Sequence, residues 1–176
     1  MAIGNISGSV SPNTRIKDFD VVLSNLNREI KKIEGNSLRG LILVSAFIRN
    51  ETEHKPPLTP VDLGNLRSSW FTVTAEGRGK EDRHNKPFVG PKRGVYTSEH
   101  QSTIEECRGL VIGNEKSKKG KYLMMGYSVN YALYVHEMQG ARFKRHGANA
   151  KWFQTAVMRN RDKILEIVRE NAKIGK

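Results

Sequence analysis

The stretch TPVDLGNLRSSW, residues 59–70, divides a helical first third of the chain from a region with the character of strands. The prolines at 56–60 end the preceding helix, because proline lacks an amide donor and restricts the residue before it. Gly64 suits a tight turn that needs a positive φ, and we expect the flanking Asp62 and Asn65 to cap that turn with side-chain hydrogen bonds. This stretch therefore predicts a helix end, a turn and the approach to a sheet.

A long helical period precedes this stretch. Apolar residues recur there at steps of three and four, namely Ile16, Phe19, Val22, Leu23, Leu26, Ile30 and Ile33. Gly35 and Asn36 interrupt the period, which then resumes up to Arg49. Residues 15–55 are therefore predicted to be one bent helix or two helices with a short break. Residues 1–14, rich in Gly, Ser and Asn, predict a flexible arm.

The remainder of the chain predicts strands and a closing helix. Residues 66–76 carry aromatic and β-branched side chains and predict a strand, with Leu66 and Trp70 buried. The segments 104–113 and 121–130 predict a hairpin joined by a basic loop. A helix with an apolar stripe follows from about Asn149, which we expect to be its N-cap.

This order of elements predicts an α+β fold. We expect a small antiparallel sheet of three to four strands, packed by the long N-terminal helix (or helix pair) and a C-terminal helix. A length of 176 residues favours a single domain. Its expected parts are the arm at 1–14, the helical part at 15–55, the sheet at 59–137 with a long basic insertion at 77–103, and the C-terminal helix at 149–174. An insertion of that length is either functional or disordered.

The net charge of +12 is the extreme value of the composition. Such an excess indicates association with polyanions. The charge is concentrated in residues 78–93, in 116–121 and in the segment from Arg142 onward. Aromatic residues lie among these basic ones and could stack on bases, namely Phe88, Tyr96 and Phe143. The tyrosines at 122, 127, 131 and 134 are better explained as core residues.

Other compositional signals exclude several classes of protein. No apolar run approaches the roughly 20 residues of a membrane-spanning helix, so we expect no membrane association. The N-terminal stretch lacks the basic region and apolar core of a secretory signal. Cys107 is the single cysteine, which excludes an internal disulfide and fits a reducing compartment. We expect it to be a buried structural residue.

Catalytic and metal-binding patterns are missing from the sequence. The five histidines match no helical ligand spacing, and no nucleophile elbow or phosphate-binding loop is present. A magnesium nuclease would require scattered carboxylates to meet in space, the candidates being Asp62, Glu76, Glu105, Glu106 and Glu137. We therefore expect no enzymatic activity, no catalytic residue, no metal and no cofactor.

Two motifs resemble those of a family of tailed-bacteriophage proteins, the small neck or tail-completion proteins that join head to tail. The first motif matches at Pro60, Asp62, Gly64, Leu66, Arg67 and Ser69. The second matches at Tyr131, Ala132, Tyr134, Val135, His136 and Glu137. The motifs lie between a long N-terminal helix and a final helix that opens with AKWFQTAV. Leu63 stands where the family usually has Thr, and the insertion at 77–103 exceeds the usual connection.

The resemblance implies a virion structural protein of the neck, assembled in the host cytoplasm as a ring around the DNA channel. Its implied partners are copies of itself (as a hexamer or dodecamer), other neck, connector and tail-tube proteins, and the passing genomic DNA. The places of Arg67 and Glu137 in the two motifs suggest that these residues pair. Our candidates for contact with the channel or a neighbouring subunit are Arg78, Lys80, Arg83, Lys86, Lys92, Arg93, Lys116, Lys118, Lys119 and Lys121.

The charge also leaves a second hypothesis open. The protein could be a nucleic-acid-binding protein that acts outside the virion as a monomer or dimer. Because no sequence-reading motif is present, its contacts would be with phosphate and independent of sequence. A magnesium nuclease is the third and least supported hypothesis.

Overall fold

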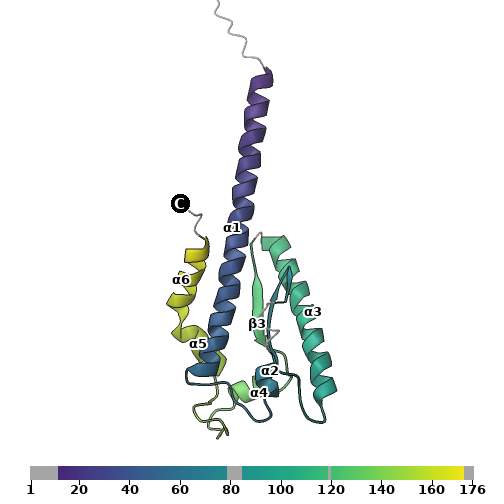
Figure 1. Cartoon of the computed structure of the whole chain (residues 1–176), viewed down its shortest axis with the longest axis vertical. Helices are drawn as coiled ribbons and strands as arrows, with labels where there is room; N and C mark the ends of the chain where they lie inside the picture. Colours follow the sequence, from purple (N-terminus) through teal and green to yellow (C-terminus); the bar gives the residue numbers. More distant parts are fainter. Residues whose placement is uncertain (1–11, 79–84, 119, 173–176) are drawn as a thin grey trace, which may run out of the picture.

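The computed structural model describes residues 12–78, 85–118 and 120–172 (Figure 1). Its first element is a single helix, α1, at Pro12–His54. Gly35 and Asn36 do not interrupt it, so one continuous helix is the correct alternative. At 1.5 Å per residue its 43 residues span about 65 Å. The start of α1 takes in residues 12–14 of the expected arm, and residues 1–11 lie outside the described ranges.

The sheet is small and antiparallel. Strand β1 (Trp70–Thr74) pairs along its whole length with β3 (Leu123–Tyr127), from Trp70 opposite Tyr127 to Thr74 opposite Leu123. The two-residue β2 (Gly77–Arg78) turns back on the other edge of β1, which gives the order β2-β1-β3. The α+β class is confirmed, but the expected count of three to four strands is not, because only β1 and β3 are full strands.

Both faces of β1 are covered, which explains why all five of its residues are buried. Trp70 packs on Val44 and Ile48 of α1, together with apolar residues of α5 (Trp152–Arg159) and α6 (Arg161–Ala172). Phe71 and Val73 face the other way, towards Ile104 and Cys107 of α3 (Arg93–Lys118). The sheet therefore lies between α3 and the group formed by α1, α5 and α6 (Figure 1).

Two short helices complete the fold at the C-terminal end of α1. Helix α2 (Asn65–Ser68) leads into β1, and α4 (Ala132–Glu137) follows β3. At the other end, α1 extends well beyond the rest of the molecule (Figure 1). The last turn of α6 reaches α1 at Gly40, whose Cα faces Val168 and Asn171. We call residues 12–35 the projecting half of α1.

The predicted strand at 104–113 is wrong, because this segment lies within α3. The insertion at 77–103 likewise becomes helical from Arg93. The buried residues His100, Ile104, Cys107 and Val111 follow one another at helical spacing and cover one face of the sheet. Burial of Cys107 is confirmed, although it lies in a helix rather than a strand.

Three further boundaries differ from the predictions. The strand expected at 66–76 is confined to β1, since α2 occupies most of the residues before it. The closing helix expected at 149–174 begins at Trp152 and is divided at Asn160 into α5 and α6. Asn149 is not its N-cap, because Lys151 holds that position with a φ of 59° and no side-chain cap.

Candidate functional site

The two motifs, more than 60 residues apart in sequence, meet in one packed cluster. Leu66 of the first motif is buried against Val129, Ala132 and Trp152. Tyr131 and Val135 of the second motif pack on this group. We call this region, residues 59–69 together with 129–137, the motif junction.

The first motif forms the turn that the sequence predicts, but by different hydrogen bonds. Gly64 has a φ of 90°, a conformation that residues with a Cβ rarely adopt. Ser69 Oγ donates to the carbonyl of Leu66 at 2.8 Å. Asn65 does not cap the turn: its side chain exchanges two hydrogen bonds with the backbone of Val89, at 3.0 and 2.9 Å. Asp62 pairs instead with Lys144.

A surface cavity of about 420 Å³ opens over the junction. One wall comes from residues 60–66, and the other from Tyr131, Val135 and Met138. Leu63 lies at its edge with its side chain largely exposed. Burial, reinforced by the nearby Tyr96 and acidic groups, raises the pKa of Tyr131 to about 12, so its hydroxyl stays protonated. The cavity offers apolar side chains and a neutral phenol, with the charged residues Asp62, Arg142 and Lys144 also in its lining.

Two carboxylates at the C-terminal end of α1 hold the junction in place. Glu53 accepts Arg67 Nε at 2.6 Å and Arg145 Nη1 at 3.3 Å, and the same Arg145 nitrogen donates to the carbonyl of Thr59 at 3.0 Å. The predicted Arg67–Glu137 pair is therefore wrong, since Arg67 pairs with Glu53. These contacts link α1, the first motif and the loop before α5.

Glu51 forms the more deeply buried of these contacts, with only 1% of its side chain exposed. It pairs with Lys55 at 2.7 Å and accepts Arg159 Nη2 at 3.1 Å and Asn160 Nδ2 at 2.9 Å. Burial alone raises the pKa of a carboxyl group, but the bonds from Lys55, Asn160 and Arg159 outweigh it, so the pKa of Glu51 lies below its ordinary value. This carboxylate joins α1 to the α5–α6 break.

The second motif ends in a polar contact on the surface. Glu137 accepts hydrogen bonds from Lys151 and from His136 Nδ1, and these bonds hold the pKa of Glu137 below its ordinary value. The His136 ring also lies edge-on to Trp152, with ring centroids 4.8 Å apart. His136 and Glu137 therefore position the start of α5.

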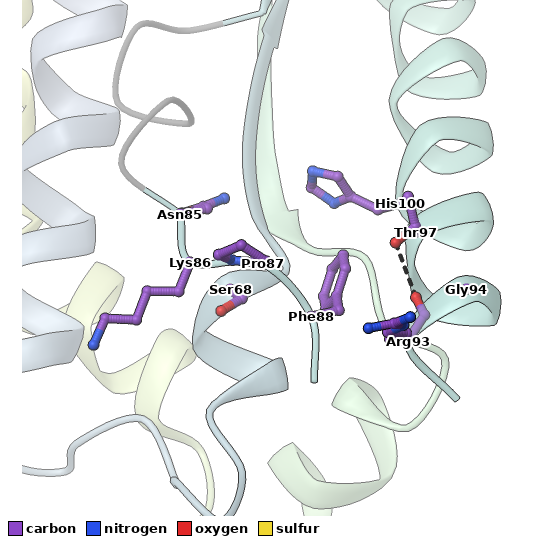
Figure 2. A pocket seen from close by; sticks show the side chains of 9 residues that line it. All are labelled: Ser68, Asn85, Lys86, Pro87, Phe88, Arg93, Gly94, Thr97 and His100. Atoms are coloured by element: carbon purple, nitrogen blue, oxygen red, sulfur yellow. Dashed lines mark hydrogen bonds between the residues drawn. The ribbon is translucent and has the colours of Figure 1, made fainter. Parts of the chain in front are cut away.

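A second cavity, of about 620 Å³, lies between the segment before α3 and the first turns of α3 (Figure 2). We call it the basic groove; its lining residues are Ser68, Asn85, Lys86, Pro87, Phe88, Arg93, Gly94, Thr97 and His100. In Figure 2 Arg93 lies beside Phe88, whereas Lys86 extends away from α3. Lys86, Lys92 and Arg93 are exposed, and no ion pair to them is found within residues 12–78, 85–118 and 120–172.

Two asparagines fix the chain that carries these cations. Asn85 donates from its side chain to the carbonyl of Trp70 at 2.6 Å and accepts from Arg49. Asn65 holds Val89 as described above. Phe88 between them packs on Tyr96 and His100, with centroid distances of 5.9 and 5.7 Å. The groove is thus attached to both α1 and β1.

The ten predicted basic contact residues do not form one surface. Lys86 and Arg93 line the basic groove and Lys92 directly precedes Arg93, while Lys116 is exposed near the far end of α3. The length of α3, 26 residues, separates these two places by roughly 35–40 Å. Lys121 pairs with Glu115 at 3.3 Å. Lys80, Arg83 and Lys119 lie outside the described residues, as do the side chains of Arg78 and Lys118.

The predictions for the aromatic residues are also correct only in part. Phe88 and Tyr96 are half-buried and pack against the junction cluster, so their rings are not open platforms for bases. Tyr127 and Tyr131 pack in the core as expected. Tyr134 does not, since 69% of it is exposed on α4 beside the equally exposed Leu133.

The described part of the chain contains no group of three or more His, Cys, Asp or Glu residues that could hold a metal ion. The five carboxylates considered for a nuclease therefore do not gather within it. Burial, followed by the charge of Glu106, raises the pKa of the Cys107 thiol, which leaves it protonated and inaccessible. Within the same residues, no helix has both the length and the apolar character needed to cross a membrane.

Compared with models of protein families, with curated proteins and with solved structures, the chain has no match. The functional argument therefore depends on the geometry above and on the two motifs. Sequence reasoning missed the residues that hold the junction together, which are Glu51, Glu53, Asn85, Arg145, Arg159 and Asn160. Their only signal is an acidic pair in the last turn of a predicted helix, and no spacing rule links it to arginines more than 90 positions away.

Proposed function

We propose that this protein is a non-catalytic structural component of the neck of a tailed-phage particle, where it joins the tail to the head as a ring around the DNA channel. The observation that carries this proposal is the motif junction. The two stretches that resemble the neck and tail-completion family pack against each other through Leu66 and Tyr131. Independent, coincidental matches would have no reason to form a single cluster.

The proposed ring uses copies of this chain, six or twelve in number, stacked between connector and tail-tube proteins in the virion. The exposed apolar residues near the junction, Leu63, Leu133 and Tyr134, suit contacts with such neighbours because they leave large apolar side chains in water. A ring needs interfaces that join different surfaces of adjacent copies. The cavity over the junction and the exposed face of α4 are two such surfaces.

The exposed cations of the basic groove fit the proposed DNA channel. Lys86, Lys92 and Arg93 would lower the electrostatic cost of holding phosphates, without reading sequence. Strong binding would impede the passage of DNA. We therefore expect weak binding to duplex DNA that falls steeply as salt concentration rises.

The test is removal of the gene from a phage that carries it, followed by electron microscopy of the lysate. We expect filled heads separated from tails, with joining restored by the wild-type chain supplied in trans. A Leu66→Asp variant, which disrupts the junction, should fail to restore joining, whereas the control Leu110→Asp, at an exposed site on α3, should restore it. Normal joined particles in the absence of the gene would contradict the proposal.

The basic groove also favours the alternative of a nucleic-acid-binding protein that acts outside the virion. The two proposals differ in the affinity that they require. The alternative predicts micromolar or tighter binding to DNA at physiological salt, at or beyond the tight end of the range of roughly 10⁻⁴–10⁻⁶ M for non-specific binding. Reversing the charges of Lys86, Lys92 and Arg93 together would abolish its function. Tight binding by a chain that is missing from purified particles would establish this alternative.

A further inference from the structure

The projecting half of α1 has an apolar pattern but no partner within the described chain. Leu26 is 53% exposed there, and its neighbours from Ser24 to Arg28 are exposed as well. Among the residues of α1 whose side chains the structure describes, the first buried one is Leu38, close to the point where α6 ends. Isolated helices are marginal in water, and most helical stability in proteins comes from packing of an apolar face. The described part of the chain supplies no such packing for this half of the helix.

The spacing of the apolar residues defines the kind of contact. Positions 16, 19, 23, 26, 30 and 33 are all Ile, Leu or Phe, and they alternate steps of three and four without exception. This is a heptad pattern with its a positions at 16, 23 and 30 and its d positions at 19, 26 and 33. A repeat of 3.5 residues is what two helices need to keep one seam in contact as they wind about each other. We call these six positions the seam.

The fold indicates what lies along the seam. Continued at the same spacing, the seam reaches Gly40 and Val44, which are covered by α6 and its neighbours. Helix α6 runs antiparallel to α1 and ends where the projecting half begins (Figure 1). A helix in line with α6 therefore fits the seam, and it must also run antiparallel to α1. A parallel copy of α1 would meet the place that α6 already occupies.

We propose that the projecting halves of two copies of this chain pair as an antiparallel coiled coil. The seam is self-complementary in this orientation: position 16 meets 33 of the second copy, 19 meets 30, and 23 meets 26. The pair is a closed contact between identical surfaces. It does not depend on the proposed function, because it uses a region far from the motif junction.

Sedimentation equilibrium of the full chain tests the pairing. We expect a monomer–dimer equilibrium across the micromolar range. Leu26→Lys should raise the dimer dissociation constant by at least about tenfold, because it places a charge among the six apolar layers. The matched control is Leu43→Lys, an exposed leucine (44%) of the same helix that lies outside the seam and beside the body. A monomer at all concentrations, or equal effects of the two variants, would overturn the proposal.

Disulfide crosslinking tests the orientation in the same full-length chain. A mixture of Ile16→Cys and Ile33→Cys chains should form a crosslinked dimer under mild oxidation, whereas each variant alone should remain uncrosslinked. Native Cys107 is buried and does not compete. Crosslinking of each variant with itself would show a parallel pair and overturn the antiparallel arrangement.

Discussion

The two ends of α1 belong to the same helix but are stabilised in opposite ways. At its C-terminal end, Glu51 and Glu53 are held by arginines from distant loops, and Ile48 is fully buried against the sheet. In the projecting half, Glu29 and Lys32 form an exposed ion pair at 4.0 Å, and Leu26 is exposed to water. A surface contact of that kind contributes little.

This difference shows that one continuous helix can serve two purposes. The C-terminal half of α1 packs against the sheet, so its stability depends on that of the sheet. The projecting half gains little from the rest of its own chain and is available to another molecule. Substitutions at the two ends should therefore differ in both size and sign.

The largest contrast is expected between Trp70→Ala and Leu26→Ala. Trp70 is 1% exposed and lies edge-on to Tyr127 and Phe153, so its truncation should lower the free energy of unfolding by about 3–5 kcal/mol. Leu26→Ala, measured on dilute monomer, should change it by less than about 0.5 kcal/mol. Chemical denaturation followed by tryptophan fluorescence measures both, with Trp152 as the reporter in the first variant. Equal losses would remove the distinction between the packed body, where Trp70 of β1 contacts α1, and the projecting half.

The second contrast concerns carboxylates. Glu51→Ala removes the buried carboxylate that Arg159 and Asn160 share and leaves them only the carbonyls of Pro56 and Ala156, so it should cost about 2–3 kcal/mol of unfolding free energy. Glu29→Ala removes only an exposed contact and should stay within about 0.5 kcal/mol of the wild type. Urea denaturation of the two variants is the measurement. A neutral Glu51→Ala would mean that this ion pair does not anchor α5 and α6.

Substitution by alanine should lower stability at Gly64 and raise it at Gly35. Gly64→Ala forces a Cβ into a turn with φ of 90° and should destabilise the protein by about 1–2 kcal/mol. Gly35→Ala meets no atom within 4 Å inside a helix and should stabilise that helix by up to about 1 kcal/mol. Thermal denaturation followed by circular dichroism should give a lower Tm for the first variant and greater helicity for the second. The same sign for both would contradict the assignment of the turn or of the helix.

The smallest expected effect is a pH dependence. Because the pKa of Glu51 is lower in the folded protein than its ordinary value of 4.5, its carboxylate contributes stability that is fully present above the unfolded-state pKa. That contribution is lost as the pH falls through the folded-state pKa. Glu51→Gln should therefore show a shallower loss of stability in acid than the wild type, by denaturation at a series of pH values below neutrality. Parallel curves would indicate that Glu51 is not the titrating group.

The sequence predicted the parts of the fold that depend on local patterns. A period of three and four residues located α1, and aromatic and β-branched residues located β1. The segment 121–130 was predicted as a strand and contains β3, although its partner is β1 rather than the expected 104–113. Helix α3 was missed because the β-branched Ile104, Val111 and Ile112 of the segment 104–113 suggested a strand. The helical spacing of His100, Ile104, Cys107 and Val111 was the stronger signal, because it defines a buried face.

The candidate site was harder to predict than the fold, because most of its contacts join segments that are distant in sequence. Gly64 and Leu66 were predicted correctly, since turn chemistry and burial are local properties. Ion pairs depend on which distant segments meet, and the choice of Glu53 rather than Glu137 by Arg67 is made by the packing of α1 against the first motif. The hydrogen bonds between the Asn65 side chain and the backbone of Val89 likewise depend on which segments meet in the fold.

The most direct test of the proposed function is a cryo-electron microscopy reconstruction of the neck in virions of a phage that encodes this chain. The proposal predicts a ring between the head connector and the tail, into which the body of this protein fits, with the basic groove facing either the channel or a neighbouring copy. A complete neck built from other chains, with this protein missing from the particle, would contradict the proposal.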